Sequence, residues 1–303
     1  MNRKSFFITL LLLASCTTSA LAQTWPFLRH EVYGGLGATN FLGELGGAND
    51  IGTNGIKDLE FSMTRPTINI GYRFVATPTF AFKAGFNQGW LSGNDSKTSE
   101  PARQNRNLNF KSAISEITVM VEYYPFTEKI DHMYRMKGVR GKRPRYLSPY
   151  ITAGVGGFFF NPKGKYNGTW YALHNLQTEG QGLPGGPKDY KRVSICLPVG
   201  IGIKYALSKV WSIGFEVAGR KTFTDYIDDV STVYYDPTAL AAINPNSPLL
   251  ADPSLGLIPG ATSPNADGTG AQRGDATDND SYMLAIISVH YRFLKYRMHL
   301  PKF

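Results

Sequence analysis

The sequence predicts an all-β protein, an eight-stranded antiparallel up-and-down transmembrane β-barrel with short periplasmic turns, one of them long and basic, and long outer loops. Three observations lead to this fold class. An export leader opens the sequence, no later apolar run reaches the roughly 20 residues that a membrane-spanning helix needs, and apolar and polar residues alternate with period two. A closed barrel is the β structure that leaves no free edge in lipid.

Residues 1–22 have the pattern of a secretory signal peptide, with Arg3 and Lys4 before an apolar stretch and a small-residue cleavage site at Ala22. A second interpretation stays open, because the residues that end at Cys16 also fit a lipoprotein cleavage box with Cys16 as the acylated residue. Both interpretations predict export. The expected division is a signal peptide over 1–22, an outer-membrane β-barrel over 23–293 and a basic periplasmic tail over 294–303.

Eight segments are expected to be strands. Six alternate clearly, and two are Gly-rich and alternate weakly. The six are Ile68–Phe74, Phe80–Asn87, Glu116–Tyr123, Ile195–Tyr205, Trp211–Ala218 and Met283–Phe293, and the two are His30–Asn40 and Ser148–Phe160.

The two faces of these strands differ in a way that favours a barrel over a soluble sandwich. A solvated sandwich face would be rich in Thr, Lys and Glu, whereas here glycines are mixed with charges of both signs, which suits a crowded barrel interior. The apolar face has aromatic residues near its ends, as a lipid-facing belt does. The predicted interior charges are Arg73, Lys83, Glu116, Glu122, Lys204, Glu216 and Arg220.

Connection lengths predict which way the barrel points. The links at 76–79 and 206–209 are tight, and those at 42–65, 92–109, 161–193 and 223–281 are long. Bacterial barrels have short periplasmic turns and long outer loops, so both termini are expected in the periplasm. The segment Glu128–Arg145 then replaces a short inner turn.

This inner segment has a net charge of +5, and the last ten residues add +3, while the chain without its leader has a net charge of +7. Such local basicity predicts docking to an acidic protein surface rather than nucleic-acid binding. An alternative is a solvated loop that brushes anionic headgroups of outer-membrane lipid. The predicted partner-binding residues are Lys129, Arg135, Lys137, Arg140, Lys142, Arg143, Arg145, Lys295 and Arg297.

Acidic residues gather on two outer loops, and Arg220 is expected to point inward toward Glu116, Glu122 or Glu216. Six outer carboxylates could bind Ca²⁺, but their spacing is not that of an EF-hand, and Asp residues also build turns. Turn-building is the preferred interpretation, and neither a metal nor a cofactor is predicted. The six are Asp225, Asp228, Asp229, Asp275, Asp278 and Asp280.

Catalysis and diffusion are both disfavoured. Of the five histidines only His174 lies in an outer loop, so no nucleophile–base pair is expected, and eight strands leave no aqueous channel. Cys196 is expected to be an inert thiol inside the barrel. Pro198 cannot donate to the strand ladder, which predicts a bulge there.

Five stretches resemble the PorG family of outer-membrane barrels, which belong to the type IX secretion system of Bacteroidota. The resemblance implies a non-enzymatic scaffold that associates with a PorK-like periplasmic lipoprotein and a PorN-like ring subunit. Adhesion through the outer loops and a lipid-modifying enzyme are the alternatives. The stretches are Gly34–Leu45, Ser148–Lys163, Leu173–Gly182, Arg220–Asp236 and Gln272–Phe293. The most specific one includes the lip residues Arg220, Thr222, Phe223, Asp225, Tyr226, Asp228 and Asp229.

Overall fold

The computed structural model describes residues 29–43, 45, 61–98, 100–126, 145–258 and 271–293. The predicted signal peptide, including Ala22 and the alternative lipidation site Cys16, lies outside the described residues, and so does the tail 294–303. Of the predicted partner-binding residues, Arg145 alone is described.

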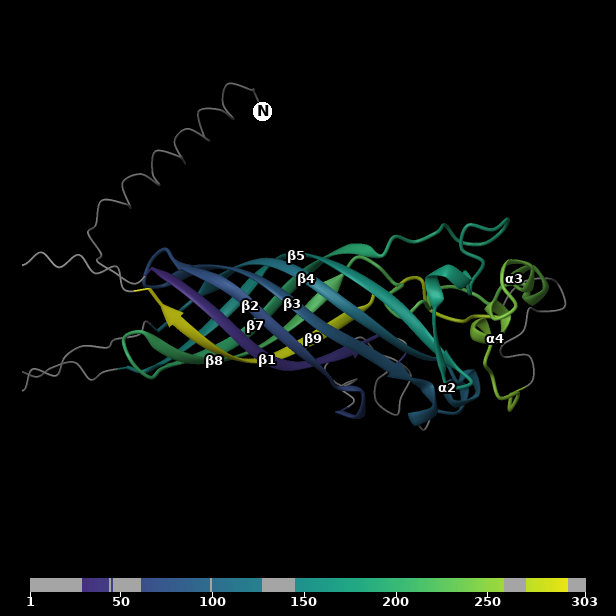
Figure 1. Cartoon of the computed structure of the whole chain (residues 1–303), viewed down its shortest axis with the longest axis horizontal. Helices are drawn as coiled ribbons and strands as arrows, with labels where there is room; N and C mark the ends of the chain where they lie inside the picture. The colour runs from purple at the N-terminus through teal and green to yellow at the C-terminus, as the bar shows by residue number, and fades with distance from the viewer. Residues whose placement is uncertain are drawn as a thin grey trace, which may run out of the picture.

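The architecture is a closed antiparallel barrel (Figure 1). Eight strands, β1 to β5 and β7 to β9, form the ring. Each pairs with the next in this order, so that β5 pairs with β7, and β1 pairs with β9 to close the ring. The strands are β1 (His30–Leu42), β2 (Arg65–Val75), β3 (Phe80–Asn94), β4 (Asn109–Tyr123), β5 (Leu147–Tyr166), β6 (Thr169–Ala172), β7 (Val193–Ala206), β8 (Trp211–Thr222) and β9 (Ser281–Arg292). The helices are η3 (Phe61–Met63), η4 (Asp95–Lys97), α2 (Pro101–Arg106), η5 (Leu173–Leu176), α3 (Pro237–Ile243) and α4 (Ser247–Ala251).

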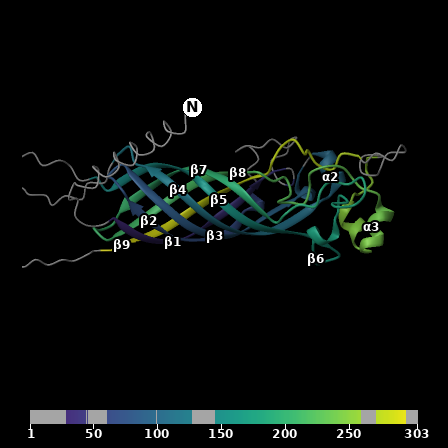
Figure 2. The same cartoon turned by 90° about the horizontal axis from the view of Figure 1, so that it is seen from above.

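The eight predicted barrel strands are confirmed, and β1 begins and β9 ends at the same end of the barrel as the short turns. His30 pairs with Phe74 just before the β2–β3 turn, and Trp211 after the β7–β8 turn pairs with Tyr291 near the end of β9. We call this end the inner end and the opposite one the outer end. The short helices α2, α3 and α4 gather at the outer end (Figures 1 and 2).

Strand β5 is longer than predicted, because it extends six residues beyond Phe160 and folds back as a hairpin with β6. Asn167 and Gly168 form the turn, both with positive φ, +45° and +83°. An Asn-Gly pair between two strand-forming runs favours such a two-residue hairpin, so the sequence contained this signal.

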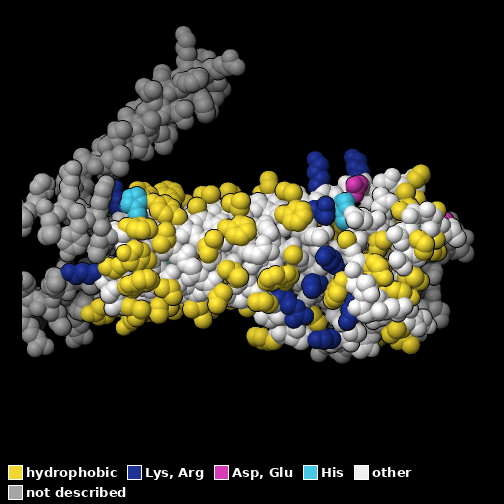
Figure 3. All heavy atoms as spheres, viewed as in Figure 1, with side chains coloured by type: hydrophobic (Ala, Val, Ile, Leu, Met, Phe, Trp, Pro, Cys, Tyr) yellow, Lys and Arg dark blue, Asp and Glu magenta, His cyan; other side chains and the backbone are white. Residues whose placement is uncertain are grey.

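The faces alternate as predicted. On β7 the outward residues Ile195, Val199 and Ile201 are 58–66% exposed, whereas Cys196, which faces the interior from the same strand, is fully buried. Figure 3 shows hydrophobic side chains spread along the cylinder of the barrel. Within the described residues no helix is long and apolar enough to cross a membrane.

The predicted bulge at Pro198 is wrong. The β5–β7 register skips two residues on each strand around Pro198 and resumes unchanged, with Ala153 opposite Val199 and Gly156 opposite Cys196. A bulge would add a residue to one strand only. The proline therefore interrupts hydrogen bonding without shifting the register.

Two inward tyrosines cross over glycines of the neighbouring strand. Tyr33 lies opposite Gly71, and Tyr150 lies opposite Gly202. A Cβ atom at either glycine would collide with the tyrosine ring. The glycines that mark the polar face thus make room for rings that reach into the centre of the barrel.

Candidate functional site

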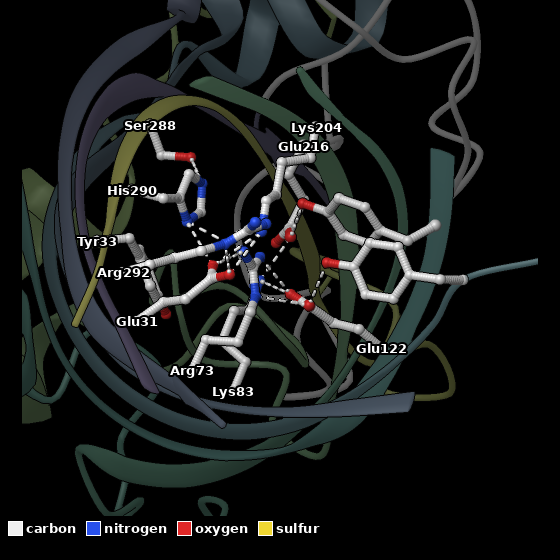
Figure 4. A network of polar contacts seen from close by, with 12 residues as sticks. Glu31, Tyr33, Arg73, Lys83, Glu122, Lys204, Glu216, Ser288, His290 and Arg292 are labelled. Atoms are coloured by element: carbon white, nitrogen blue, oxygen red, sulfur yellow. Dashed lines mark hydrogen bonds and ion pairs between the residues drawn. The ribbon is translucent and has the colours of Figure 1, made fainter. Parts of the chain in front are cut away.

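The inner half of the barrel is filled by an ion network centred on Glu31 (Figure 4). The Glu31 carboxylate lies 3.1 Å from Arg73 Nη1, 2.8 Å from Lys204 Nζ and 2.6 Å from Arg292 Nε. These residues come from four strands that are distant in sequence, and the Glu31 side chain is fully buried. Glu31 and Arg292 were not predicted as interior charges, although both lie on the inward face by period two.

The network continues to two further carboxylates. Arg73 Nη2 donates to Glu122 at 2.7 Å, and Lys83 Nζ lies 2.5 Å from Glu216 and 3.6 Å from Glu122. The cluster contains four cations and three carboxylates, a net charge of +1 if His290 is neutral. Its charged members are Arg73, Lys83, Lys204, Arg292, Glu31, Glu122 and Glu216.

Tyrosines complete the hydrogen bonding of these carboxylates. Tyr124 donates to Glu122 at 2.8 Å, and Tyr150 donates to Glu216 at 2.8 Å. The ring of Tyr33 lies 5.8 Å from the Arg73 guanidinium carbon. Buried charges are stable only when paired and hydrogen-bonded, and this cluster meets both conditions.

A second ion pair lies farther toward the outer end. Arg220 Nε is 3.4 Å from Glu116 Oε2, so Glu116 is the partner among the three carboxylates that the sequence offered. Asn87 donates to Glu116 at 2.9 Å, and the Tyr282 hydroxyl also donates to it. All seven predicted interior charges are buried, which confirms them. Cys196 is buried beside this pair, with its Sγ 3.9 Å from the Tyr282 hydroxyl.

The outer half of the interior is apolar, which the sequence did not predict. Phe41 and Phe110 meet edge to face with centroids 4.8 Å apart, and Phe158 lies 5.7 Å from both Phe160 and Tyr282. These rings belong to one buried cluster that reaches into the outer loops. The cavities beside Glu116 and beside Arg73 have volumes of about 10 Å³ each, room for about one water molecule.

The described outer loops are joined by a buried pair formed by Glu179 and Arg273, at 2.8 Å. Glu179 also accepts the backbone N–H groups of Ser231 and Thr232 at 2.9 and 3.1 Å. Arg273 donates to the carbonyl of Asp229 at 2.6 Å. This tie was missed, because its members are 94 residues apart in loops without periodicity.

Asp229 is a further buried acid of these outer loops. It accepts hydrogen bonds from the hydroxyls of Thr178 and Tyr190, each at 2.5 Å. Burial raises the pKa of Asp229 from 3.8 to about 6, although the nearby Arg273 acts in the opposite direction. The same burial, with the Asp229 charge beside it, raises the pKa of Tyr190 well above its usual value.

The predicted lip residues build the outer rim. Thr222 donates to the carbonyl of Asp280 at 2.7 Å, Tyr226 stacks on Tyr190 with centroids 4.5 Å apart, and Phe223 is 59% exposed. Arg220 points into the barrel as predicted, and Asp225 is buried at the rim.

Turn-building by the acidic residues is confirmed at several positions. Asp228 accepts the backbone N–H of Val230 at 3.0 Å, and Asp280 accepts that of Ile227 at 2.9 Å. Asp275 accepts that of Thr277 at 3.1 Å, while Asp278 pairs with Lys221 at 3.2 Å. Across the described ranges, no group of three or more His, Cys, Asp or Glu residues is arranged to hold a metal ion.

One histidine–serine contact was missed. Ser288 Oγ lies 2.8 Å from His290 Nε2, and His290 Nδ1 lies 3.0 Å from Arg73 Nη1. Arginine can only donate, so Nδ1 must accept, and the proton of a neutral imidazole then sits on Nε2 and points to Ser288. A base for Ser288 would need the opposite tautomer. The spacing of Ser288 and His290, two residues apart on one strand, could have revealed the contact.

His174 and Arg145 also have structural contacts. His174 Nε2 lies 3.0 Å from the carbonyl of Tyr190 in the outer loops. The guanidinium of Arg145 lies 5.2 Å from the centre of the Phe126 ring, next to β5. The other predicted partner-binding residues, on 127–144 and 294–303, lie outside the described residues.

The geometry is that of an outer-membrane β-barrel, closed, apolar outside and filled inside. Two solved structures align with the chain at 11% sequence identity and a TM-score of 0.38. Neisserial surface protein A (NspA) aligns over 88% of this chain and 99% of its own. The outer membrane protein OprG from Pseudomonas aeruginosa aligns over 88% and 95%.

A third structure, Ail, the attachment invasion locus protein of Yersinia pestis, aligns over 87% of this chain and 97% of its own at 11% identity and a TM-score of 0.38. A search of curated proteins finds no match. The sequence matches a protein family over residues 3–246, which is most of its 303 residues. The chain therefore belongs to the family described as Domain of unknown function (DUF6089).

Proposed function

We propose that the protein is a non-enzymatic outer-membrane scaffold of the type IX protein secretion system. In this proposal the inner end of the barrel anchors a periplasmic ring complex of a PorK-like lipoprotein and a PorN-like subunit. The filled interior is the observation that carries the scaffold role. With ion pairs in the inner half and aromatic rings in the outer half, the described part of the barrel offers no solute path, so we assign the function to its surfaces.

The inner end is favoured as the docking surface because the strands that flank the basic segments begin or end there. Strand β4 ends and β5 begins at the inner end, and β9 also ends there, so the sequence segments 127–144 and 294–303 follow strand ends at this side of the barrel. Their sequence is strongly basic. Clustered cations at one end of the barrel suit an acidic partner surface, and such attraction weakens as salt screens exposed charges.

The type IX assignment is supported by the resemblance of five stretches to the PorG family. Adhesion through the outer loops is the competing function, and it is supported by the folded loop layer around Arg273 and Glu179. Deletion of the gene separates the two functions. Loss of cargo secretion is expected for a secretion scaffold, whereas an adhesin would leave secretion unchanged and reduce surface binding.

A detergent pull-down tests the docking surface directly. The test variant changes Arg135, Lys137, Arg140, Lys142, Arg143 and Arg145 to Ser. The matched control removes six cations from the outer end by changing Lys97, Lys111, Lys163, Lys165, Lys188 and Lys191 to Ser, all of which are exposed. Both variants must first show the heat-modifiable gel shift of a folded barrel.

Wild type and the control are expected to recover the lipoprotein and the ring subunit, and the test variant to lose them. Equal recovery by all three proteins would mean that the partner binds elsewhere than at the basic loop. Recovery by none of them would remove the type IX assignment and leave adhesion as the function to test next.

A further inference from the structure

A cationic cluster faces outward just above the apolar belt, on the β4–β5 side of the barrel. Lys111 on β4 and Lys163 and Lys165 on β5 are all exposed. No carboxylate in the described part of the chain lies within ion-pair distance of these three amines. Figure 3 shows that Lys and Arg side chains gather where the hydrophobic cylinder meets the outer loops.

The strand register holds the three amines together. Lys111 lies directly opposite Lys163, and Lys165 is two residues farther along the same face. The Asn109 side chain fixes the backbone of Lys165, accepting its N–H at 2.8 Å and donating to its carbonyl at 3.3 Å. Like charges directly opposite each other destabilise a sheet, so this arrangement favours an external anion.

An aromatic ring borders the cluster. Trp170 pairs with Lys165 across the β5–β6 hairpin, and the Lys111 ammonium lies 5.2 Å from the centre of its ring. Trp170 is 40% exposed. Tryptophan beside lysine is the combination found at the headgroup level of membranes, where an amphipathic ring meets polar groups.

The outward row below the cluster is apolar. Phe159 and Val155 on β5 are 41% and 56% exposed, and Ile117 on β4 is 67% exposed. Lys163 is four residues beyond Phe159, which is about 14 Å along the strand. At a strand tilt of about 45° this places it roughly 10 Å farther along the barrel axis, toward the outer end. Arg192 lies between the apolar residues and the lysines. Its guanidinium carbon is 5.5 Å from the centre of the Phe159 ring, and its Nη1 is 3.2 Å from Asn161 Oδ1.

We propose that Lys111, Lys163, Lys165 and Arg192 bind the phosphate of an anionic lipid in the outer leaflet. The continuity of the cluster with the apolar belt selects a lipid over a free phosphate, because acyl chains would lie on Val155 and Phe159 while the phosphate meets the amines. Ammonium groups recognise phosphate as point charges, and Arg192 adds a guanidinium donor near the belt.

The test uses the full-length protein in detergent micelles with lipid A that has two phosphates, followed by native mass spectrometry to count retained lipid. Dephosphorylated lipid A and inorganic phosphate are the comparison ligands. The test variant is K111Q/K163Q/K165Q. The matched control K97Q/K188Q/K209Q loses the same charge at exposed positions elsewhere, and K111R/K163R/K165R keeps the charge. Each variant must show the heat-modifiable shift.

Wild type, the control and the Arg variant are expected to retain phosphorylated lipid at least about tenfold better than the Gln variant, since each lysine near an anionic surface contributes about fivefold. All four proteins should retain the dephosphorylated lipid equally. Equal retention by the Gln variant and wild type would overturn the proposal. Displacement of the lipid by millimolar inorganic phosphate would overturn the lipid source and indicate a free-phosphate site.

Discussion

Replacing Glu31 by Gln tests whether the ion network stabilises the barrel. The side chain keeps its shape and loses its charge, while three cations, Arg73, Lys204 and Arg292, remain within 3.1 Å of it. Lys204 then has no carboxylate within ion-pair distance in the described part of the chain. The cluster changes from a net charge of +1 to +2.

The expected loss is about 3–5 kcal/mol in the free energy of unfolding, the range measured when one partner of a buried ion pair is removed. Urea unfolding of the protein in phospholipid vesicles, followed by tryptophan fluorescence, gives this quantity. The matched control is Asp278→Asn, which breaks an exposed pair at 3.2 Å with Lys221. An exposed pair contributes about 0–1 kcal/mol, so the control should unfold almost like wild type.

A double variant separates the charge effect from packing. Glu31→Gln with Lys204→Met returns the network to a net charge of +1 and removes the unpaired ammonium. It should be more stable than Glu31→Gln alone by at least about 1 kcal/mol, because neighbouring charges couple. If Glu31→Gln unfolds like Asp278→Asn, or if the two changes simply add, the network does not stabilise the barrel.

Three further outcomes are expected. Gly202→Val should displace the Tyr150 ring and lower the free energy of unfolding by about 1–3 kcal/mol, whereas Gly219→Val, whose Cβ has open space, should have little effect in the same urea assay. Burial raises the pKa of Asp229 from 3.8 to about 6, so folding favours its protonated form. The free energy of unfolding of the outer loops should therefore fall by up to about 3 kcal/mol as pH rises from 4 to above 6. Asp229→Asn, compatible with φ +68°, should flatten that pH dependence in hydrogen exchange, and an unchanged profile would contradict the assignment. Cys196 should resist maleimide in the folded barrel and react after unfolding, so rapid labelling of folded protein would refute its burial.

The alternation of the strands made the barrel and its two faces predictable. Residues such as Arg73 and Glu216 could be assigned to the interior because period two alone decides the face. Their partners could not be assigned, since pairing across a barrel depends on the register between strands. Arg220 had three candidate carboxylates, and the register selected Glu116.

The outer half of the barrel was harder to predict. There the strands extend toward the loop layer, so inward positions such as Phe158 and Tyr282 are apolar and the contrast between the two faces disappears. The loop tie between Glu179 and Arg273 joins segments without periodicity, and no local pattern indicates it. The β5–β6 hairpin was the exception, because Asn167 and Gly168 contain a readable turn signal.

Planar-bilayer conductance tests the central claim that the barrel is sealed and acts through its surfaces. The refolded wild type is expected to give no discrete conductance steps, because the Glu31 network and the rings around Phe158 fill its interior. Reproducible single-channel steps from folded wild type would contradict this account and indicate a solute path through the barrel.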